Sequence, residues 1–262
     1  MTVTERFVDA DEEPLRRIMP IEDYENEPLV TLQEATKNLQ RSIKKINAMV
    51  RIAKKNYISD PTNNLTVDEA AAIYLYTIEK KKAHKTVSFQ LNKTLRSNER
   101  NELTPWLSYL RLFLSGLNKL PSIKGTIWRF ARGDVTGNYQ TDCVWFGFSS
   151  CTGIKLVLDR FLDRTSMYTL FRIECINGKS IHNYSSRPDE DEVLLMPGTY
   201  LRLMSKGKLQ NGLCFVHLQE NVPQYLHPGQ PLGFSSSTYD THRTDQYFRS
   251  PTIQPNDQKK CM

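Results

Sequence analysis

Apolar residues recur every three or four positions between about residues 32 and 120, which is the spacing of helices buried along one side. One such stripe, from about Leu32 to Tyr57, predicts a long helix. A second helix is predicted to begin at Thr66, because Thr66 and Glu69 form the Thr-x-x-Glu pattern of a capping box. Further helices are predicted for residues 86–96 and 103–120.

After Pro121 the period changes to two, and short segments rich in β-branched and aromatic residues alternate with turn residues. One predicted helix, about Gly153 to Phe161, interrupts them. With so few crossovers, most strand pairs should be antiparallel. The pattern predicts an α+β fold, in which a helical N-terminal lobe packs on a mostly antiparallel, β-sandwich-like core. The predicted strands cover residues 125–134, 142–150, 167–176, 179–185, 191–196, 199–205 and 213–220.

Charge and composition divide the 262 residues further. Residues 1–30 hold nine acidic and three basic side chains and several prolines, which predicts an irregular arm that lies over the surface or is disordered. Residues 31–120 form the predicted helical lobe, and residues 121–226 form the β-rich core. Residues 227–262 are rich in Pro, Ser, Thr and Gln, so we expect a mobile tail.

Several classes of protein are disfavoured. No apolar run is long enough to span a bilayer, and the first residues lack the apolar core of a secretory signal, so a cytoplasmic location is expected. Five scattered cysteines and five histidines show no spacing of metal ligands, and no metal is expected. Walker and Gly-x-Gly-x-x-Gly loops are absent. The basic helix at 32–57 lacks interleaved aromatics, so nucleic acid is not an expected partner.

Three short motifs carry candidate chemistry. Arg129 lies in a predicted strand between two aromatic residues, and strand alternation places it on the opposite face from them. Ser150 stands where a strand ends. Glu190 and Glu192 lead into the apolar run "VLLM", and a strand at this point would direct both carboxylates to one face.

In this order the motifs resemble those of the arginine-specific mono-ADP-ribosyltransferases, the R-S-E class with the cholera-toxin-like and animal ecto-ADP-ribosyltransferase fold. The resemblance spans about Leu65 to Glu220. The sequence departs from the family at Phe130, because the family usually has glycine after the arginine. The matching motifs are Trp128-Arg129, Ser150-Cys151-Thr152 and Glu190-Asp191-Glu192.

The resemblance implies that NAD+ is the co-substrate and that ADP-ribose passes to a protein with an exposed arginine. Glu192 would then be the catalytic glutamate, held in its rotamer by Ser150, while Arg129 binds the NAD phosphates and Glu190 receives the target guanidinium. Tyr184 would lie in the target-recognition turn, where it either stacks on the target or caps the core. The remaining candidates for the NAD site are Phe130, Thr152 and Phe161.

Two alternatives stay open. The same pocket in an NAD+ glycohydrolase would use water in place of arginine. Alternatively, Phe130 could block the nicotinamide, which would leave a catalytically impaired NAD-binding module.

Overall fold

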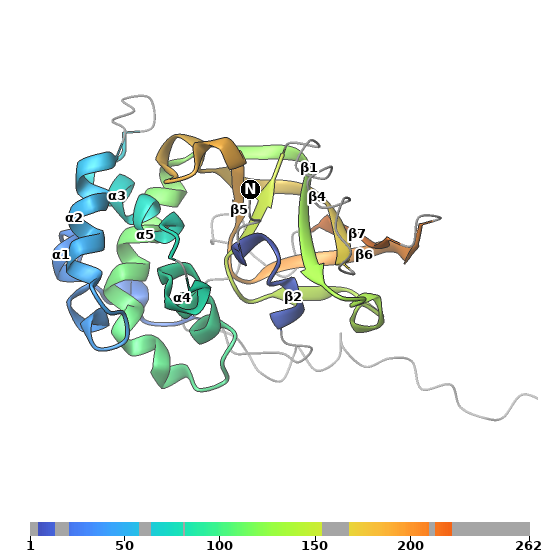
Figure 1. Cartoon of the computed structure of the whole chain (residues 1–262), viewed down its shortest axis with the longest axis horizontal. Helices are drawn as coiled ribbons and strands as arrows, with labels where there is room; N and C mark the ends of the chain where they lie inside the picture. Colours follow the sequence, from blue (N-terminus) through green and yellow to red (C-terminus); the bar gives the residue numbers. More distant parts are fainter. Residues whose placement is uncertain are drawn as a thin grey trace, which may run out of the picture.

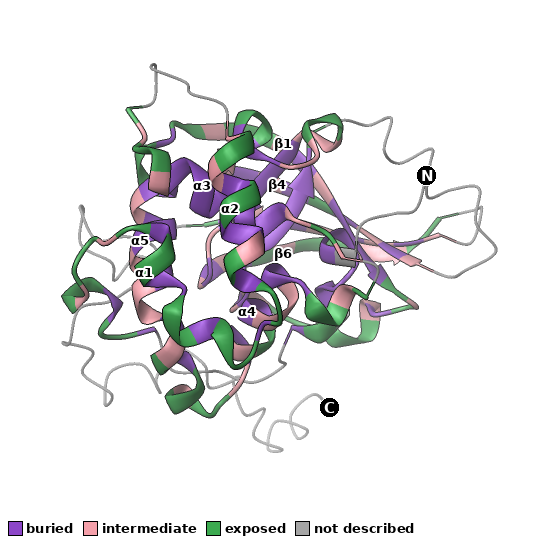
Figure 2. Ribbon diagram, turned by 60° about the vertical axis from the view of Figure 1, so that its left-hand side comes forward, coloured by how far each residue is buried: buried purple, intermediate pink, exposed green. Residues whose placement is uncertain are grey.

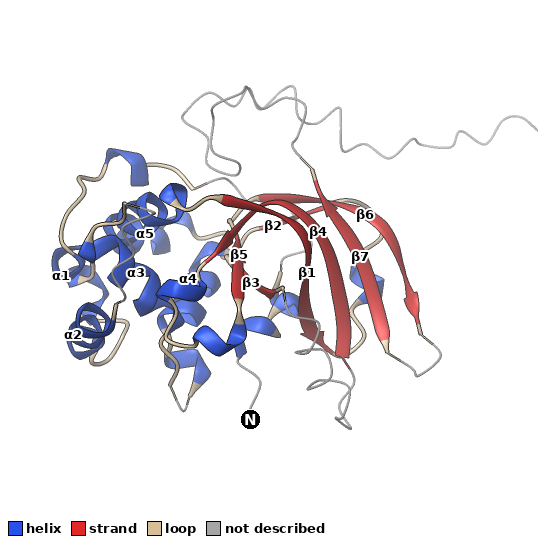
Figure 3. Ribbon diagram, turned by 90° about the horizontal axis from the view of Figure 1, so that it is seen from above, coloured by secondary structure: helices blue, strands red, loops and turns tan. Residues whose placement is uncertain are grey.

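The computed structural model describes residues 5–13, 21–57, 64–80, 82–153, 168–209 and 213–221. Within them a group of helices lies beside a curved sheet (Figures 1 and 3), which confirms the predicted α+β class. The predicted helix at 153–161 and the tail at 227–262 lie outside these ranges, apart from Gly153. The α-helices are α1 (Leu32–Ala35), α2 (Ile46–Asn56), α3 (Val67–Thr77), α4 (Val87–Leu95) and α5 (Leu107–Lys119).

The prediction of one long helix over residues 32–57 is wrong. α1 is followed by a 3-10 helix, Lys37–Gln40, and α2 begins only after Lys45, whose φ of 66° is left-handed. The Thr36 hydroxyl donates a hydrogen bond of 2.8 Å to the Leu32 carbonyl, four residues earlier. A hydrogen bond of this kind often bends a helix. The apolar stripe is nevertheless buried, because its period specifies which side chains reach the core and not whether the helix axis is continuous.

The predicted capping box of α3 is confirmed. The Thr66 hydroxyl accepts the Glu69 N–H at 3.2 Å, and the Glu69 carboxylate accepts the Thr66 N–H at 2.8 Å. Ser115 and Lys119 of α5 donate to the same carboxylate at 2.6 and 2.7 Å. Burial would raise the pKa of Glu69, but these donors lower it below its usual value. One charged side chain therefore begins α3 and joins it to α5.

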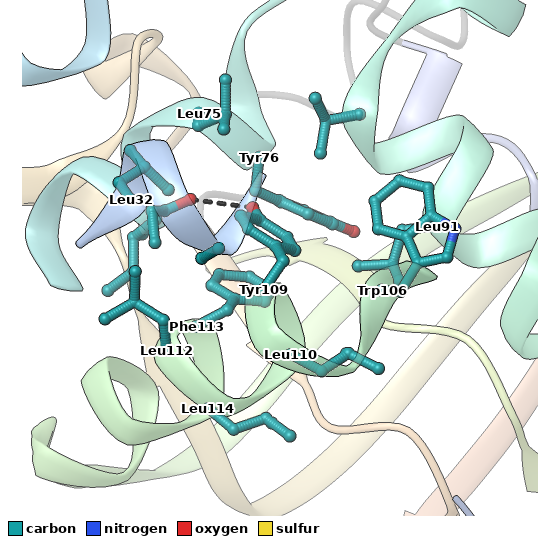
Figure 4. Close-up of a cluster of buried hydrophobic side chains, with 14 of the residues drawn as sticks. Leu32, Leu75, Tyr76, Leu91, Trp106, Tyr109, Leu110, Leu112, Phe113 and Leu114 are labelled. Carbon is teal, nitrogen blue, oxygen red and sulfur yellow. Dashed lines mark hydrogen bonds between the residues drawn. The ribbon is translucent and has the colours of Figure 1, made fainter. Parts of the chain in front are cut away.

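α3 and α5 are largely buried (Figure 2), and aromatic and leucine side chains pack in the core between α3, α4 and α5 (Figure 4). The Tyr76 and Phe113 rings stack with their centres 5.1 Å apart, and the Tyr109 hydroxyl donates to the Ala72 carbonyl at 2.9 Å. The Phe113 ring also lies 4.9 Å from that of Phe148, just before a strand of the sheet. The helical core is thus continuous with the strands that carry the candidate site.

The sheet runs in the order β1-β3-β5-β4-β7-β6-β2, and β1 also pairs with β4, so that the sheet folds over on itself. The β4–β7 pair is parallel, and the other described pairs are antiparallel. The strand predicted at 179–185 is wrong, because β4 ends at Ser180 and a 3-10 helix, His182–Tyr184, follows. The strands are β1 (Ser122–Arg132), β2 (Cys143–Trp145), β3 (Ser149–Thr152), β4 (Tyr168–Ser180), β5 (Glu192–Leu195), β6 (Thr199–Lys208) and β7 (Cys214–Glu220).

The described residues contain neither a candidate membrane-spanning helix nor a candidate metal-binding cluster. None of their helices combines the length and apolar character needed to cross a bilayer. The same residues contain no cluster of three His, Cys, Asp or Glu side chains arranged to hold a metal ion.

Candidate functional site

Strand register brings the three sequence motifs together. β3 pairs with β5 so that Ser150 lies opposite Leu194 and Thr152 lies opposite Glu192. Because alternate residues of a strand share a face, Ser150, Thr152 and Glu192 lie on the same side of this pair. β1 meets β3 beside Thr152, and the Arg129 guanidinium donates to the Ser150 carbonyl at 3.2 Å.

Arg129 is completely buried. Its guanidinium lies 5.4 Å from the centre of the Trp145 ring and pairs with the carboxylate of Asp9. Its Nε makes no hydrogen bond within the described part of the chain. Trp128 and Phe130 pack in a separate apolar cluster, as alternation along β1 predicts.

Glu190 reaches the site by a different route from the one predicted. It ends a 3-10 helix, Pro188–Glu190, and Asp191 then adopts a left-handed conformation with φ of 43° before β5 begins. The strand assignment of Glu190 is therefore wrong, although its carboxylate still converges with that of Glu192. The Thr152 hydroxyl holds this turn by donating to the Glu190 carbonyl at 3.0 Å. Gly153 packs so closely that a Cβ there would lie 3.1 Å from the Asp191 carboxylate.

The segment before Glu190 is attached to the end of α3. The Ser186 N–H donates to the Thr77 hydroxyl at 2.8 Å, and the Ser186 hydroxyl donates to the Thr77 carbonyl at 2.7 Å. Tyr184 is buried in the helical core with 2% of its surface exposed. Of the two roles considered for Tyr184, this position agrees with capping the core, and the side chain does not point to solvent where a target would stack.

An arginine that sequence reasoning missed occupies the carboxylate pair. Arg6 donates from Nε and Nη2 to the two oxygens of Glu192, both at 2.9 Å, and from Nη2 to Glu190 at 2.6 Å. Its Nη1 donates to Glu79 at 3.1 Å. Burial alone would lower the pKa of Arg6, but the three carboxylates outweigh burial and raise it, so the guanidinium stays charged. The pair of glutamates therefore forms a guanidinium-binding site.

A second buried arginine, Arg96 at the end of α4, was also missed. Its Nε donates to Glu13 at 2.7 Å, and its Nη1 donates to Asp9 at 3.0 Å and to Glu12 at 3.3 Å. It lies so close to Gly147 that a Cβ there would come within 2.9 Å of its Nε. The sequence offers one signal for Arg96, which is its place at the end of the "LNKTLR" segment that resembles the family.

The predicted contact between Ser150 and Glu192 is not present in this structure. The buried Ser150 hydroxyl makes no hydrogen bond of normal geometry to the described residues, and both oxygens of Glu192 bind Arg6. Burial raises the pKa of the Tyr76 phenol, and the nearby Ser150 hydroxyl opposes that rise. Phe161, the last candidate, lies outside the described residues.

A family model described as NAD:arginine ADP-ribosyltransferase matches residues 17–223. The chain belongs to this family. It is an ADP-ribosyltransferase, and the arginine, serine and glutamate motifs that converge here are those from which the resemblance was inferred. No curated protein sequence matches the chain.

Solved structures share the fold of this ADP-ribosyltransferase. The Vis ADP-ribosyltransferase of Vibrio splendidus, solved with agmatine, is 19% identical at a TM-score of 0.50 and covers 79% of this chain and 93% of its own. The type III effector XopAI of Xanthomonas axonopodis pv. citri is 16% identical at a TM-score of 0.50. The match covers 72% of this chain and 88% of XopAI. HopU1 of Pseudomonas syringae pv. tomato is 20% identical at a TM-score of 0.49. The match covers 75% of this chain and 90% of HopU1. At these identities the likeness to Vis and XopAI is evidence of a shared fold alone.

Proposed function

We propose that this enzyme cleaves the nicotinamide–ribose bond of NAD+ and transfers ADP-ribose to an arginine side chain of a protein. One observation carries the proposal: the Glu190 carboxylate, which lies beside the buried Glu192, binds a guanidinium, that of Arg6, at 2.6 Å. A carboxylate that binds a guanidinium next to the donor site is what an arginine acceptor requires, because guanidinium groups bind carboxylates through charged hydrogen bonds.

Glu192 is the group we assign to the donor. Its carboxylate is completely buried at the start of β5. In a buried site a negative charge stabilises the positive charge that develops at the ribose anomeric carbon as nicotinamide leaves. The same carboxylate is suited to accept a hydrogen bond from the ribose 2-hydroxyl, which strengthens in an oxocarbenium-like transition state.

Arg129 and Arg96 are the groups we assign to the NAD phosphates. Both are buried, and the carboxylates described against them, those of Asp9, Glu12 and Glu13, all come from residues 5–13. Without these carboxylates, two buried guanidinium groups would need another anion. Phosphate oxygens meet that need, because planar guanidinium groups bind phosphate through parallel hydrogen bonds.

Glu190 is the group we assign to the acceptor. Its side chain is 12% exposed, whereas that of Glu192 is completely buried, so Glu190 lies nearer the surface from which a target would arrive. A nitrogen of the target guanidinium attacks the anomeric carbon, and nicotinamide departs with the electron pair of the broken bond. The attacking nitrogen loses a proton, for which the Glu190 carboxylate is the nearby base.

The two other candidate functions receive less support. A pure NAD+ glycohydrolase has no need of a second carboxylate that binds guanidinium. An impaired pocket would require the Phe130 ring on the side of Arg129, whereas the ring packs against Val8 in a separate cluster.

The experiment is incubation with NAD+ labelled in the adenylate part, with and without agmatine as the arginine acceptor. The native chain and the Arg6→Gln variant are tested in parallel, since Arg6 occupies both carboxylates. We expect labelled agmatine together with stoichiometric nicotinamide. Free ADP-ribose without labelled agmatine would indicate a glycohydrolase, and no nicotinamide release from either protein would contradict the proposal.

A further inference from the structure

Residues 5–13, here called the Arg6 segment, cover the candidate site. They form two 3-10 helices, Glu5–Phe7 and Ala10–Glu12, and Asp9 makes an isolated antiparallel bridge to Ala131 of β1. In Figures 1 and 3 these helices lie between the helical part of the molecule and the sheet. Arg6 and Asp9 are only 5% and 6% exposed, so the segment is packed into the site and does not lie loosely over it.

The Arg6 segment presents the opposite charge to each charged group of the site. Arg6 faces Glu190 and Glu192, Asp9 faces Arg129, and Glu13 faces Arg96. In the proposed reaction, positive charge at the ribose and at the acceptor guanidinium would face the two glutamates, while phosphates would face the two arginines. The segment therefore reproduces the order of charges that the substrates present.

We propose that the Arg6 segment is an intramolecular inhibitor that competes with NAD+ for the site and must leave before the donor binds. This inference rests on the proposed function, because it takes Glu192 and Arg129 to be the groups that hold NAD+. The Arg6 segment precedes residues 17–223, which the family model matches, so it lies outside the part of the chain that defines the family.

The geometry favours an inhibitor over an acceptor for self-modification. Both oxygens of Glu192 accept from Arg6, and Asp9 of the same segment pairs with Arg129. An acceptor arginine would have to approach while NAD+ already occupies these groups. Arg6 instead binds in the place of the donor, and the two cannot be bound together.

An apolar contact secures the segment at the edge of β1. Val8 is 4% exposed and packs against Phe130, which is itself 2% exposed. Phe130 stands where the resemblance leads us to expect glycine, and a glycine there would have no side chain to contact Val8. The residue that departs from the family pattern is thus one that contacts the proposed inhibitor.

The first test compares NAD+ affinity by calorimetric titration in the full chain and in the full-length double variant Arg6→Gln/Asp9→Asn. A site that is open in one molecule in ten binds its ligand about tenfold more weakly than a site that is always open. We therefore expect the double variant to bind NAD+ at least about tenfold more tightly. The exposed Arg41 provides a matched control, and Arg41→Gln should bind like the native chain.

A synthetic peptide with the sequence of residues 5–13 should compete with NAD+ for the double variant, and the same peptide with glutamine in place of Arg6 should compete less.

A third measurement, limited proteolysis by trypsin, uses the native chain and needs no variant. At NAD+ concentrations that saturate the native chain, trypsin should cleave after Arg6 faster than without NAD+, while cleavage after Arg41 keeps its rate. Thermal melting of each variant shows whether it has folded.

The outcomes separate this inference from the function on which it rests. Equal NAD+ affinity in the native chain and the folded double variant would overturn the inhibitor and leave the transferase proposal intact. Unchanged cleavage after Arg6 at saturating NAD+, or ADP-ribose found on Arg6 together with unchanged affinity, would overturn it as well. Failure of every folded variant to bind NAD+ would instead contradict the proposed function.

Discussion

The substitution Glu190→Gln separates the two halves of the proposed reaction. Glu190 binds the guanidinium of Arg6 at 2.6 Å, and its carbonyl is held by Thr152 in the turn before β5. Glutamine keeps the size of the side chain and one acceptor oxygen but removes the charge. Glu192 is left unchanged, so the groups that we assign to NAD+ binding and cleavage are intact.

The magnitude follows from the contact that is lost. A hydrogen bond to a charged group is worth about 1.5 to 3 kcal/mol, and the low exposure of Glu190, 12% of its side chain, limits screening by water. Since each 1.36 kcal/mol is a factor of ten in rate, arginine transfer should fall by a factor of about 10 to 150. NAD+ hydrolysis should persist or rise, because the Arg6 segment loses the same contact and opens more often.

The assay measures nicotinamide release and agmatine labelling in parallel on one preparation of Glu190→Gln. The exposed Glu22 provides a matched control, and Glu22→Gln should keep both rates. If both rates fall together in Glu190→Gln, Glu190 serves the donor and the division of roles is mistaken. If neither rate falls, Glu190 is not the group that receives the acceptor guanidinium.

Two further predictions concern the donor site and the helices. In the Arg6→Gln background, Arg129→Lys should weaken NAD+ binding about tenfold by calorimetry, because an ammonium replaces a guanidinium that also bonds the Ser150 carbonyl. Unchanged affinity would remove Arg129 from the site, and Arg132→Lys, at an exposed position of the same strand, is the control. Thr66→Ala should lower stability by about 1 kcal/mol and the melting temperature by about 3 °C, with agmatine labelling unchanged, because α3 loses its cap. An unchanged melting curve would show that the Thr66 side chain does not stabilise the start of α3.

Local sequence patterns predicted the parts of the fold that depend on near neighbours. The capping box at Thr66 and Glu69 involves residues three apart, and its geometry follows from helix formation alone. Alternation along β1 placed Arg129 opposite its aromatic neighbours for the same reason. Apolar periodicity identified the buried side chains of residues 32–57 but not the break at Lys45, where one left-handed residue redirects the chain.

The candidate site was predicted in part. The order of the motifs placed Arg129, Ser150 and Glu192 together, and the register of β3 with β5 explains why they meet. The left-handed Asp191, which redirects the chain between Glu190 and β5, could not be read from alternation. The contact between Arg6 and Glu192 joins residues 186 positions apart, and no local pattern encodes a pairing at that distance.

In the proposed reaction Glu192 stabilises the positive charge that forms as nicotinamide leaves, and the substitution Glu192→Gln removes the negative charge on which this role depends. Nicotinamide release and agmatine labelling should be measured with Glu192→Gln in the Arg6→Gln background, so that the Arg6 segment does not obscure the result. We expect both rates to fall by about a hundredfold or more, while NAD+ still binds and the protein still melts cooperatively. Near-native nicotinamide release from this folded variant would show that Glu192 does not have this role.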